Sequence, residues 1–324
     1  MNHLKKISIF SLVLSLLFAP GLSFAGSTGY HLLKKIPLNG DAKWDYLSFD
    51  SVNQRLYVSH GTEVLVLSPG GKVLGTVADT QGVHGVIAVT DAGVGFTSNG
   101  LTNTVTCFDL KTLKPLSQIP TGEKPDAIGY DPATGCVYVC NGKSDNATVI
   151  EVSTGKVVGT IPLGGGPEYL AADGKGHVYI NLEDKSAVVA IDTHTRKVTN
   201  TWTLAPASNP SSMAIDKANG KLFIGCRNKT MVVLDTRSGQ VIQTLPIGDH
   251  VDATVFDTTT QTIFNSCGIG VITVIHQDDP SSYSVTDTIK TLPSARTLTL
   301  DPDTHTLYLP VAEGKAFSLL VVGQ

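Results

Sequence analysis

The chain has 324 residues, with 28 acidic against 24 basic side chains and a formal net charge of −4. This balance argues against non-specific nucleic-acid binding, which depends on counterion release by clustered Lys and Arg. The five cysteines are too few for a disulfide scaffold, and their odd number leaves at least one thiol unpaired within the chain.

The first 25 residues have the three parts of a secretory signal peptide. Lys5 and Lys6 precede an apolar run, Ile7–Phe18, and the small residues Ser23 and Ala25 stand at the −3 and −1 positions of a cleavage site. A membrane anchor is the alternative, but the run has 12 residues, whereas a bilayer span needs about 20. We therefore expect cleavage after residue 25, no membrane span after cleavage, and a periplasmic or secreted protein.

Residues 26–324 are predicted to form a single domain, because one motif recurs throughout them. An apolar strand ends in Asp, a turn follows, and a second strand is built around an aromatic residue, as in 46–50 and 56–58. The aromatic residues of the seven copies are Tyr57, Phe96, Tyr138, Tyr179, Phe223, Phe264 and Tyr308. Their separations of 39 to 44 residues match the period of one four-stranded propeller blade.

Each repeat continues with two more β-branched strands joined by a short turn that contains Gly, as in 148–152 and 156–161. No segment after residue 25 has a convincing helical period. The predicted fold class is therefore all-β: a seven-bladed β-propeller of four-stranded antiparallel blades.

The two ends of the chain are predicted to complete the last blade together. The final repeat supplies strands at 297–301, 306–311 and 317–322 and is then one strand short. Residues 31–38 resemble 156–163, including an Ile-Pro-Leu triplet. We expect this N-terminal strand to be the outermost strand of the last blade, where it removes an open sheet edge.

One repeat carries a recognisable pattern, in which Asp131-Pro132-Ala133-Thr134-Gly135 leads to Val137-Tyr138-Val139-Cys140-Asn141. It resembles the repeat of the YVTN family of β-propellers, also called YncE-like proteins, and the resemblance covers essentially the whole chain after residue 25. WD40 repeats fit less well, because their Gly-His and Trp-Asp dipeptides do not recur from repeat to repeat. The resemblance implies the fold. Related seven-bladed folds include lactonases, lyases and binding modules, so function has to be argued from the site.

Equivalent positions of the seven repeats form a ring around the central channel. The position five residues before the Asp that ends each inner strand holds Asp45, Asp126, Glu168, Ser211, Asp252 and Arg296, with His84 or Gly85 in the degenerate second repeat. This position begins the innermost strand, so these residues are expected around one mouth of the channel. Such mixed chemistry is typical of an asymmetric site for one ligand. The alternative is a solvated funnel whose charges satisfy one another.

The second strands of the repeats end near the same mouth. Their last residues are Ser59-His60, Ser98-Asn99, Cys140-Asn141, Asn181, Cys226-Arg227 and Ser266-Cys267. Arg227 can hold a carboxylate or phosphate in a bidentate fork, whereas Asn99 and Asn141 each precede Gly and also fit turn chemistry. Trp44 either lines the mouth or packs between blades. The predicted ligand-binding set is Asp45, His84, Asp126, Glu168, Asp252, Arg227 and Arg296.

Two further hypotheses concern metals and thiols. Asp126, Glu168 and Asp252, with Asn141 or Asn181, offer oxygen ligands for Ca²⁺ or Mg²⁺, although they follow no local metal motif. Cys226 and Cys267 occupy the same position in neighbouring repeats. A disulfide or a soft-metal site is possible there, but buried thiols that behave as small apolar residues are favoured.

The leading functional hypothesis is a monomeric exported protein that binds a small polar ligand or a segment of a partner protein at the mouth. The second is a lactonase- or lyase-like enzyme, with His84 as acid/base and a metal or Arg296 stabilising an oxyanion. The third is a structural repeat domain without a ligand. Residues 26–324 contain no P-loop, H-E-x-x-H, haem-attachment or G-x-S-x-G motif that would decide between them.

Overall fold

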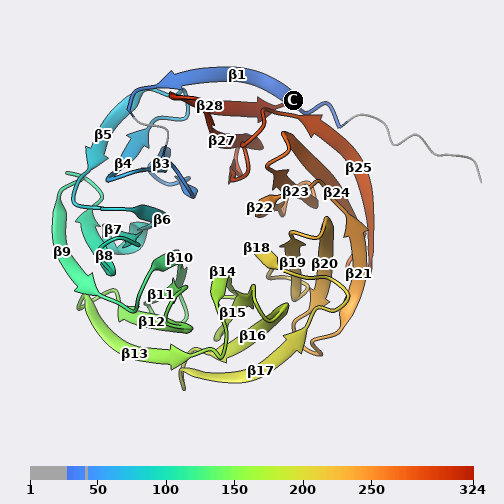
Figure 1. The fold of residues 1–324 in the computed structure, drawn as a ribbon, viewed down its shortest axis with the longest axis horizontal. Helices are drawn as coiled ribbons and strands as arrows, with labels where there is room; N and C mark the ends of the chain where they lie inside the picture. The colour runs from blue at the N-terminus through green and yellow to red at the C-terminus, as the bar shows by residue number, and fades with distance from the viewer. Residues whose placement is uncertain (1–27, 41–42) are drawn as a thin grey trace, which may run out of the picture.

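A computed structural model describes residues 28–40 and 43–324. Seven four-stranded antiparallel sheets surround a central axis in chain order (Figure 1). In the described part of the chain the single helix is a short 3-10 turn, η1 (Thr90–Ala92). The predicted seven-bladed propeller is therefore confirmed. The predicted signal peptide, residues 1–25, lies outside the described residues. No helix of the described ranges is long and apolar enough to cross a membrane.

The blades share one strand order from the centre outward. The innermost strands are β2 (Leu47–Asp50), β6 (Val83–Val89), β10 (Pro125–Asp131), β14 (Pro167–Ala172), β18 (Pro210–Asp216), β22 (Val251–Asp257) and β26 (Thr299–Asp301). The second strands are β3 (Arg55–His60), β7 (Val94–Asn99), β11 (Cys136–Asn141), β15 (His177–Leu182), β19 (Lys221–Cys226), β23 (Thr262–Cys267) and β27 (Thr306–Glu313).

The outermost strand of each blade is exposed, whereas the third strand is largely buried. The third strands are β4 (Glu63–Leu67), β8 (Thr104–Asp109), β12 (Asn146–Glu151), β16 (Ala187–Asp192), β20 (Thr230–Asp235), β24 (Val271–Asp279) and β28 (Ala316–Gly323). The outermost strands are β5 (Val73–Val77), β9 (Pro115–Pro120), β13 (Lys156–Pro162), β17 (Lys197–Thr203), β21 (Val241–Pro246), β25 (Ser282–Lys290) and β1 (His31–Leu38).

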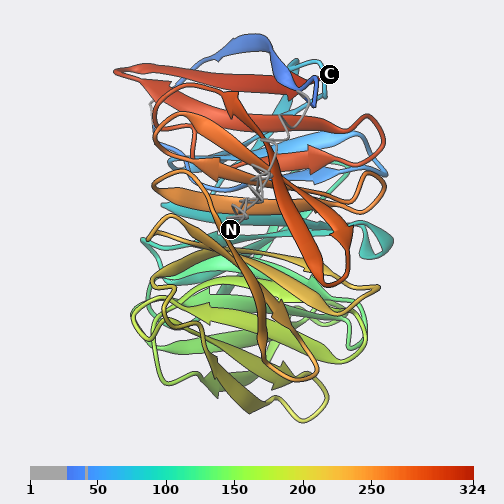
Figure 2. The ribbon, with the colours of Figure 1, turned by 90° about the vertical axis from the view of Figure 1, so that its right-hand side faces the viewer.

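The last blade is closed by strands from both ends of the chain. β1 pairs antiparallel with β28, from His31 opposite Gly323 to Leu38 opposite Phe317. Figure 2 shows the blue β1 lying against the red C-terminal strands at one edge of the disc. The predicted closure is confirmed, including the bounds of the N-terminal strand. The inner strand of this blade begins at Thr299 rather than at residue 297, because its pairing with β27 starts there.

The Asp that ends an inner strand closes the turn that follows it. The Asp216 carboxylate accepts hydrogen bonds from the backbone N–H groups of Ala218 and Asn219, at 3.0 and 3.1 Å. Equivalent bonds form at Asp50, Asp131, Asp173, Asp257 and Asp301. In the second blade Thr90 stands at this position and η1 replaces the turn. The Asp of the repeat motif therefore ends the strand, because its carboxylate bonds the backbone of a turn in place of a further strand residue.

The core lies between the blades. The seven repeated aromatic residues are buried, with exposed fractions of 0 to 3%, and several pack on rings of the next blade. Tyr57 lies 5.9 Å from Phe108 and Phe223 lies 5.0 Å from Phe256, measured between ring centroids. Tyr308 of the last blade packs in one cluster with Leu56 of the first. Because each blade buries its faces against two neighbours, the ring is stable only when it is closed.

Candidate functional site

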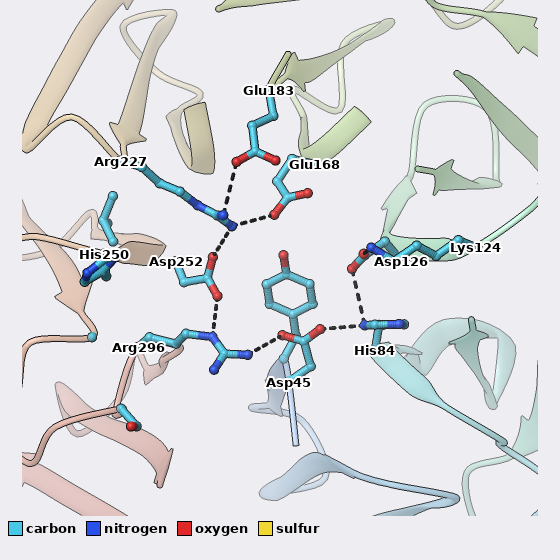
Figure 3. Close-up of a pocket in the computed structure, with 14 residues that line it drawn as sticks. Asp45, His84, Lys124, Asp126, Glu168, Glu183, Arg227, His250, Asp252 and Arg296 are labelled. Carbon is cyan, nitrogen blue, oxygen red and sulfur yellow. Dashed lines mark hydrogen bonds and ion pairs between the residues drawn. The ribbon is translucent and has the colours of Figure 1, made fainter. Parts of the chain in front are cut away.

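One open cavity of about 580 Å³ lies where the innermost strands begin. All seven residues of the ligand-binding set predicted from the sequence line this cavity, together with seven others: Tyr46, Lys124, Glu183, His250, Val251, Gly268 and Ser294. Every blade contributes at least one lining residue. Figure 3 shows the charged side chains converging from the surrounding strands. We call this cavity with its lining residues the mouth.

One side of the mouth is built around two arginines. The Arg227 guanidinium lies 3.1 Å from Glu168, 3.2 Å from Glu183 and 3.3 Å from Asp252. The Arg296 Nε donates a hydrogen bond of 2.6 Å to the other oxygen of Asp252. Asp252 therefore links the two guanidinium groups (Figure 3). We call these five residues the arginine side.

The opposite side is built around an imidazole. His84 Nδ1 lies 2.6 Å from Asp45 Oδ2 and 3.6 Å from Asp126 Oδ1. Lys124 Nζ lies 3.6 Å from the other oxygen of Asp126. We call Asp45, His84, Lys124 and Asp126 the histidine side (Figure 3).

Arg296 joins the two sides. Its Nη2 lies 3.8 Å from Asp45 Oδ1, and its guanidinium carbon lies 4.5 Å from the centroid of the Trp44 ring. Trp44 packs partly against the core between the last and first blades and does not line the mouth itself. Its ring supports Arg296 by a cation–π contact, so its role is to position a mouth residue.

The mouth carries more carboxylates than permanent cations. Asp45, Asp126, Glu168, Glu183 and Asp252 stand against Lys124, Arg227 and Arg296, which leaves an excess of two carboxylates. Asp126 and Asp252 are buried, with side chains 9 and 10% exposed. Like charges held close together in a partly dry site favour proton uptake. The mouth is therefore suited to bind positive charge.

The carboxyl groups respond to this crowding. Burial, with the nearby carboxylates of Asp126 and Glu183, raises the pKa of Glu168 to about 8, against the opposing effect of Arg227. Burial also raises the pKa of Asp126 to about 6, although His84 and Lys124 act in the other direction. The pKa of Asp252 is raised by burial too. At neutral pH Glu168 is thus mainly a neutral acid that can donate a hydrogen bond.

The pKa values of the imidazole and of the phenol in the mouth are both raised. Burial lowers the pKa of His84, but the hydrogen bond to Asp45 and the charge of Asp126 outweigh burial, so the net shift is upward. Burial raises the pKa of Tyr46 well above its ordinary value, and the carboxylates of Asp126 and Asp45 add to this effect. The Tyr46 ring meets Tyr169 edge-on at 5.3 Å between centroids.

A layer of buried polar side chains holds the inner strands of neighbouring blades together at the level of the mouth. Ser98 donates to the backbone carbonyl of Asp126, Ser266 to that of Ala295 and Thr297 to that of Asp45. Each bond crosses from one blade to the next and ends at or beside a mouth residue. We call these three residues, with Ser211, the hydroxyl layer.

Ser211 belongs to this layer rather than to the mouth. Sequence register placed it in the ring with the charged residues, but its side chain is fully buried. Its Oγ donates a 2.6 Å hydrogen bond to the Val251 carbonyl. A hydroxyl on Cβ is short enough to bond the adjacent backbone, whereas a longer carboxylate at the same register extends into the channel.

The metal set expected from the sequence does not assemble. Glu168 and Asp252 are bound to arginines, and Asp126 faces His84. Asn141 and Asn181 are buried and do not line the mouth. Their amides donate to Thr148 and to the Ser212 carbonyl. In the described ranges, the group whose ligand atoms lie within 4.8 Å of one another is Asp45, His84 and Asp126.

The two thiols at equivalent positions are not bonded. Cys226 and Cys267 are both free and buried, and they belong to different core clusters, one on each side of the fifth blade. They act as small apolar residues, which is the role that the sequence favoured.

The charged or polar mouth residues that the sequence analysis missed are Tyr46, Lys124, Glu183, His250 and Ser294. Glu183 directly follows β15, as Arg227 directly follows β19, so the register of the second strands was a sufficient signal. Lys124 precedes β10, two residues before Asp126, and the same repeat position holds Lys43 before Asp45 and His250 before Asp252. Tyr46 follows Asp45, and strand alternation would have turned it away. Both residues precede β2, so that alternation does not apply.

Comparisons with known proteins support the fold alone. No family model matches the chain, and no curated protein matches it. Hydrazine synthase of Kuenenia stuttgartiensis is 16% identical, with a TM-score of 0.75 over 84% of this chain and 93% of that chain. A chain of the mitotic checkpoint complex is 14% identical, with a TM-score of 0.78 over 96 and 98%. The U3-55K structure is 9% identical, with a TM-score of 0.80 over 91 and 100%.

These similarities show the propeller fold. Identities this low carry no site residue from those proteins to this chain. The resemblance to YVTN repeats stays a prediction from the repeat motif, and the function has to be argued from the mouth.

Proposed function

We propose that this chain is an exported binding protein whose mouth takes a small polar ligand. The observation that carries the proposal is the convergence of charged side chains from all seven blades on one cavity of about 580 Å³. A cavity of that size accommodates a small molecule. Binding of a polar segment from a partner protein is the second form of the same proposal.

Energetics favour a ligand site over a structural ring. Burying carboxylates costs free energy, and the hydroxyl layer already joins the blades at this level. The raised pKa values of Glu168 and Asp126 record that cost. Groups perturbed in this way, gathered in one cavity, are typical of functional sites. The four carboxyl groups other than the neutral Glu168 still outnumber the three permanent cations of the mouth, which favours a ligand that carries a positively charged group.

The test is a thermal-shift screen of the chain without residues 1–25 against amines, amino acids, dicarboxylates and sugars. At least one class should raise the melting temperature, and calorimetry should then give its Kd. Arg296→Ala and Glu168→Gln should lose that affinity and stay folded. Arg237→Ala, an 82% exposed arginine outside the mouth, should retain it. Unchanged affinity in both mouth variants would favour a structural ring without a ligand.

Export is a separate part of the proposal. It rests on the signal-peptide pattern of residues 1–25. Intact-mass measurement of periplasmic material should find a chain that begins at Gly26, and light scattering should find a monomer. Recovery of the uncleaved chain in a membrane fraction would make the segment an anchor.

A lactonase- or lyase-like enzyme is the second candidate function. The specific observation is the 2.6 Å contact between His84 Nδ1 and Asp45, because a carboxylate that orients an imidazole is a common acid/base arrangement. Arg296, which reaches Asp45 from the arginine side, provides the cation for an oxyanion. Turnover of a lactone or of a β-elimination substrate, lost in His84→Ala and kept in Arg237→Ala, would favour this candidate over simple binding.

A further inference from the structure

The histidine side holds three metal-ligating groups from three consecutive blades. Asp45, His84 and Asp126 belong to the first, second and third blades, and each offers one ligand atom within 4.8 Å of the other two. His84 Nδ1 stands between the carboxylates, 2.6 Å from one and 3.6 Å from the other. Only small shifts are needed to bring the three atoms to about 2.0–2.2 Å from a common ion.

The carboxylate oxygens that face away from His84 are held by cations. Asp45 turns Oδ2 to His84 and Oδ1 to Arg296, 3.8 Å away. Asp126 turns Oδ1 to His84 and Oδ2 to Lys124, 3.6 Å away. Outer contacts of this kind fix the orientation of ligating groups. The remaining two oxygens are thereby left beside the imidazole nitrogen.

A polar side chain without a partner lies in the same wall. Tyr46 lines the mouth and is only 8% exposed, yet within the described ranges its hydroxyl has no hydrogen-bond partner in the protein. Asp126 and Asp45 are the carboxylates that contribute most to the raised pKa of Tyr46. The Tyr46 hydroxyl is not one of the fully buried polar atoms that lack a partner. It is therefore open to the cavity and can donate a hydrogen bond to a species bound beside the two carboxylates and the imidazole.

The donor set selects the kind of ion. Ca²⁺ and Mg²⁺ take oxygen ligands almost exclusively, whereas an imidazole nitrogen with two carboxylates suits Zn²⁺ and other first-row divalent ions. Three protein ligands on one wall of an open cavity leave further coordination positions for water or a ligand.

Other His–Asp pairs of this chain lack the third group. His305 Nδ1 lies 2.6 Å from Asp257 and His177 Nδ1 lies 3.2 Å from Asp173, but neither pair belongs to a group of three ligands in the ranges described. The His305–Asp257 pair has the same contact distance as His84–Asp45 and lies outside the mouth. It is therefore a matched control.

We propose that Asp45, His84 and Asp126 bind one divalent transition-metal ion of the Zn²⁺ type in the wall of the mouth. The ion would replace the contact between His84 and Asp45 and would lie within reach of the Tyr46 hydroxyl. This inference goes beyond the proposed function, because it stands whether or not an organic ligand binds in the rest of the cavity.

The experiment is a calorimetric titration of the chelator-treated chain, residues 26–324, with Zn²⁺, and in parallel with Ca²⁺. Visible absorption of bound Co²⁺ reports whether the ion has gained nitrogen and oxygen ligands from the protein. The wild-type chain should bind one Zn²⁺. His84→Ala and Asp126→Asn should weaken binding by roughly tenfold or more, and His305→Ala should leave it unchanged.

Circular dichroism and melting curves establish that each variant is folded. If His84→Ala fails to fold, Asp126→Asn, which keeps the side-chain shape, carries the test. The proposal is overturned by absence of Zn²⁺ binding to the wild-type chain, by unchanged affinity in both mouth variants, or by binding of Ca²⁺ in preference to Zn²⁺. A failed organic-ligand screen with intact Zn²⁺ binding would remove the proposed function and leave this site standing.

Discussion

The hydroxyl layer and the mouth are neighbouring regions at the same end of the blades, yet they differ in chemistry. In the layer, Ser211 is fully buried and bonds the backbone of the next blade. In the mouth, Asp252 stands at the equivalent repeat position but reaches two guanidinium groups. The difference shows that a short side chain at this repeat position joins two blades, whereas a longer one reaches into the cavity. Changes in the layer should therefore lower stability, whereas changes in the mouth should alter binding and pH response.

The largest effect is expected when β1 is deleted, because the closed ring supports both the hydroxyl layer and the mouth. A chain that begins at residue 39 lacks β1, whose register with β28 runs from His31–Gly323 to Leu38–Phe317. At about 0.5–1.5 kcal/mol per lost hydrogen bond, the loss is on the order of 5 kcal/mol, comparable with the whole stability of many domains. We expect aggregation or a strongly lowered melting temperature. A chain that begins at Gly26 is the control. Equal melting temperatures of the two chains would contradict the closure of the last blade by β1.

The second effect is a pH dependence of folding stability that comes from Glu168 in the mouth. The folded pKa of Glu168, about 8, lies above its unfolded value of about 4.3, so the folded state binds this proton more tightly. Its contribution to stability is therefore present at low pH and is lost as pH rises from about 4.3 to about 8. The slope is at most about 1.4 kcal/mol per pH unit, and partial exposure reduces it.

Urea unfolding at several pH values measures this slope. Glu168→Gln should flatten the decline and be more stable than the wild-type chain above pH 8, because no carboxylate has to ionise beside Asp126 and Glu183. Glu151→Gln, on β12 and outside the mouth, is the control. A wild-type chain whose stability rises across this window would refute the burial of a protonated Glu168.

The third effect belongs to the hydroxyl layer. Ser211→Ala leaves the buried Val251 carbonyl without its 2.6 Å hydrogen bond, which costs about 1–3 kcal/mol. Denaturant midpoints should fall, while Zn²⁺ affinity and ligand affinity remain at wild-type values. Ser51→Ala, an exposed serine in the first blade, is the matched control. A loss of binding without a loss of stability would place Ser211 functionally in the mouth.

The smallest effect concerns the support of Arg296. Trp44→Leu removes the ring that lies 4.5 Å from the guanidinium carbon, and an exposed cation–π contact contributes about 0.5–1 kcal/mol. Stability should change by no more than that, and ligand affinity should fall by several-fold at most. Trp202→Leu, whose ring stacks on Tyr179 outside the mouth, is the control. A complete loss of binding would mean that Trp44 touches the ligand.

Much of the fold was readable from local chemistry. The seven aromatic positions and the Asp-capped turns repeat along the chain, because each blade needs the same buried ring and the same turn. The bounds of β1 were predicted from its likeness to another outer strand. Counting back from the capped turns also identified most of the charged mouth residues, since inner strands have nearly constant length.

The sequence by itself determined the blade count, the strand order, the closing strand and the register that brings charged side chains to one level. Only the tertiary structure decided which charges meet: Arg227 with Glu168, Glu183 and Asp252, and His84 with Asp45 and Asp126. The tertiary structure also placed the Ser211 side chain in the hydroxyl layer and raised the pKa of Glu168. The reason is physical. Register along a strand follows from local turns, but pairing across the channel and the cost of burial depend on distances between blades that no single repeat encodes.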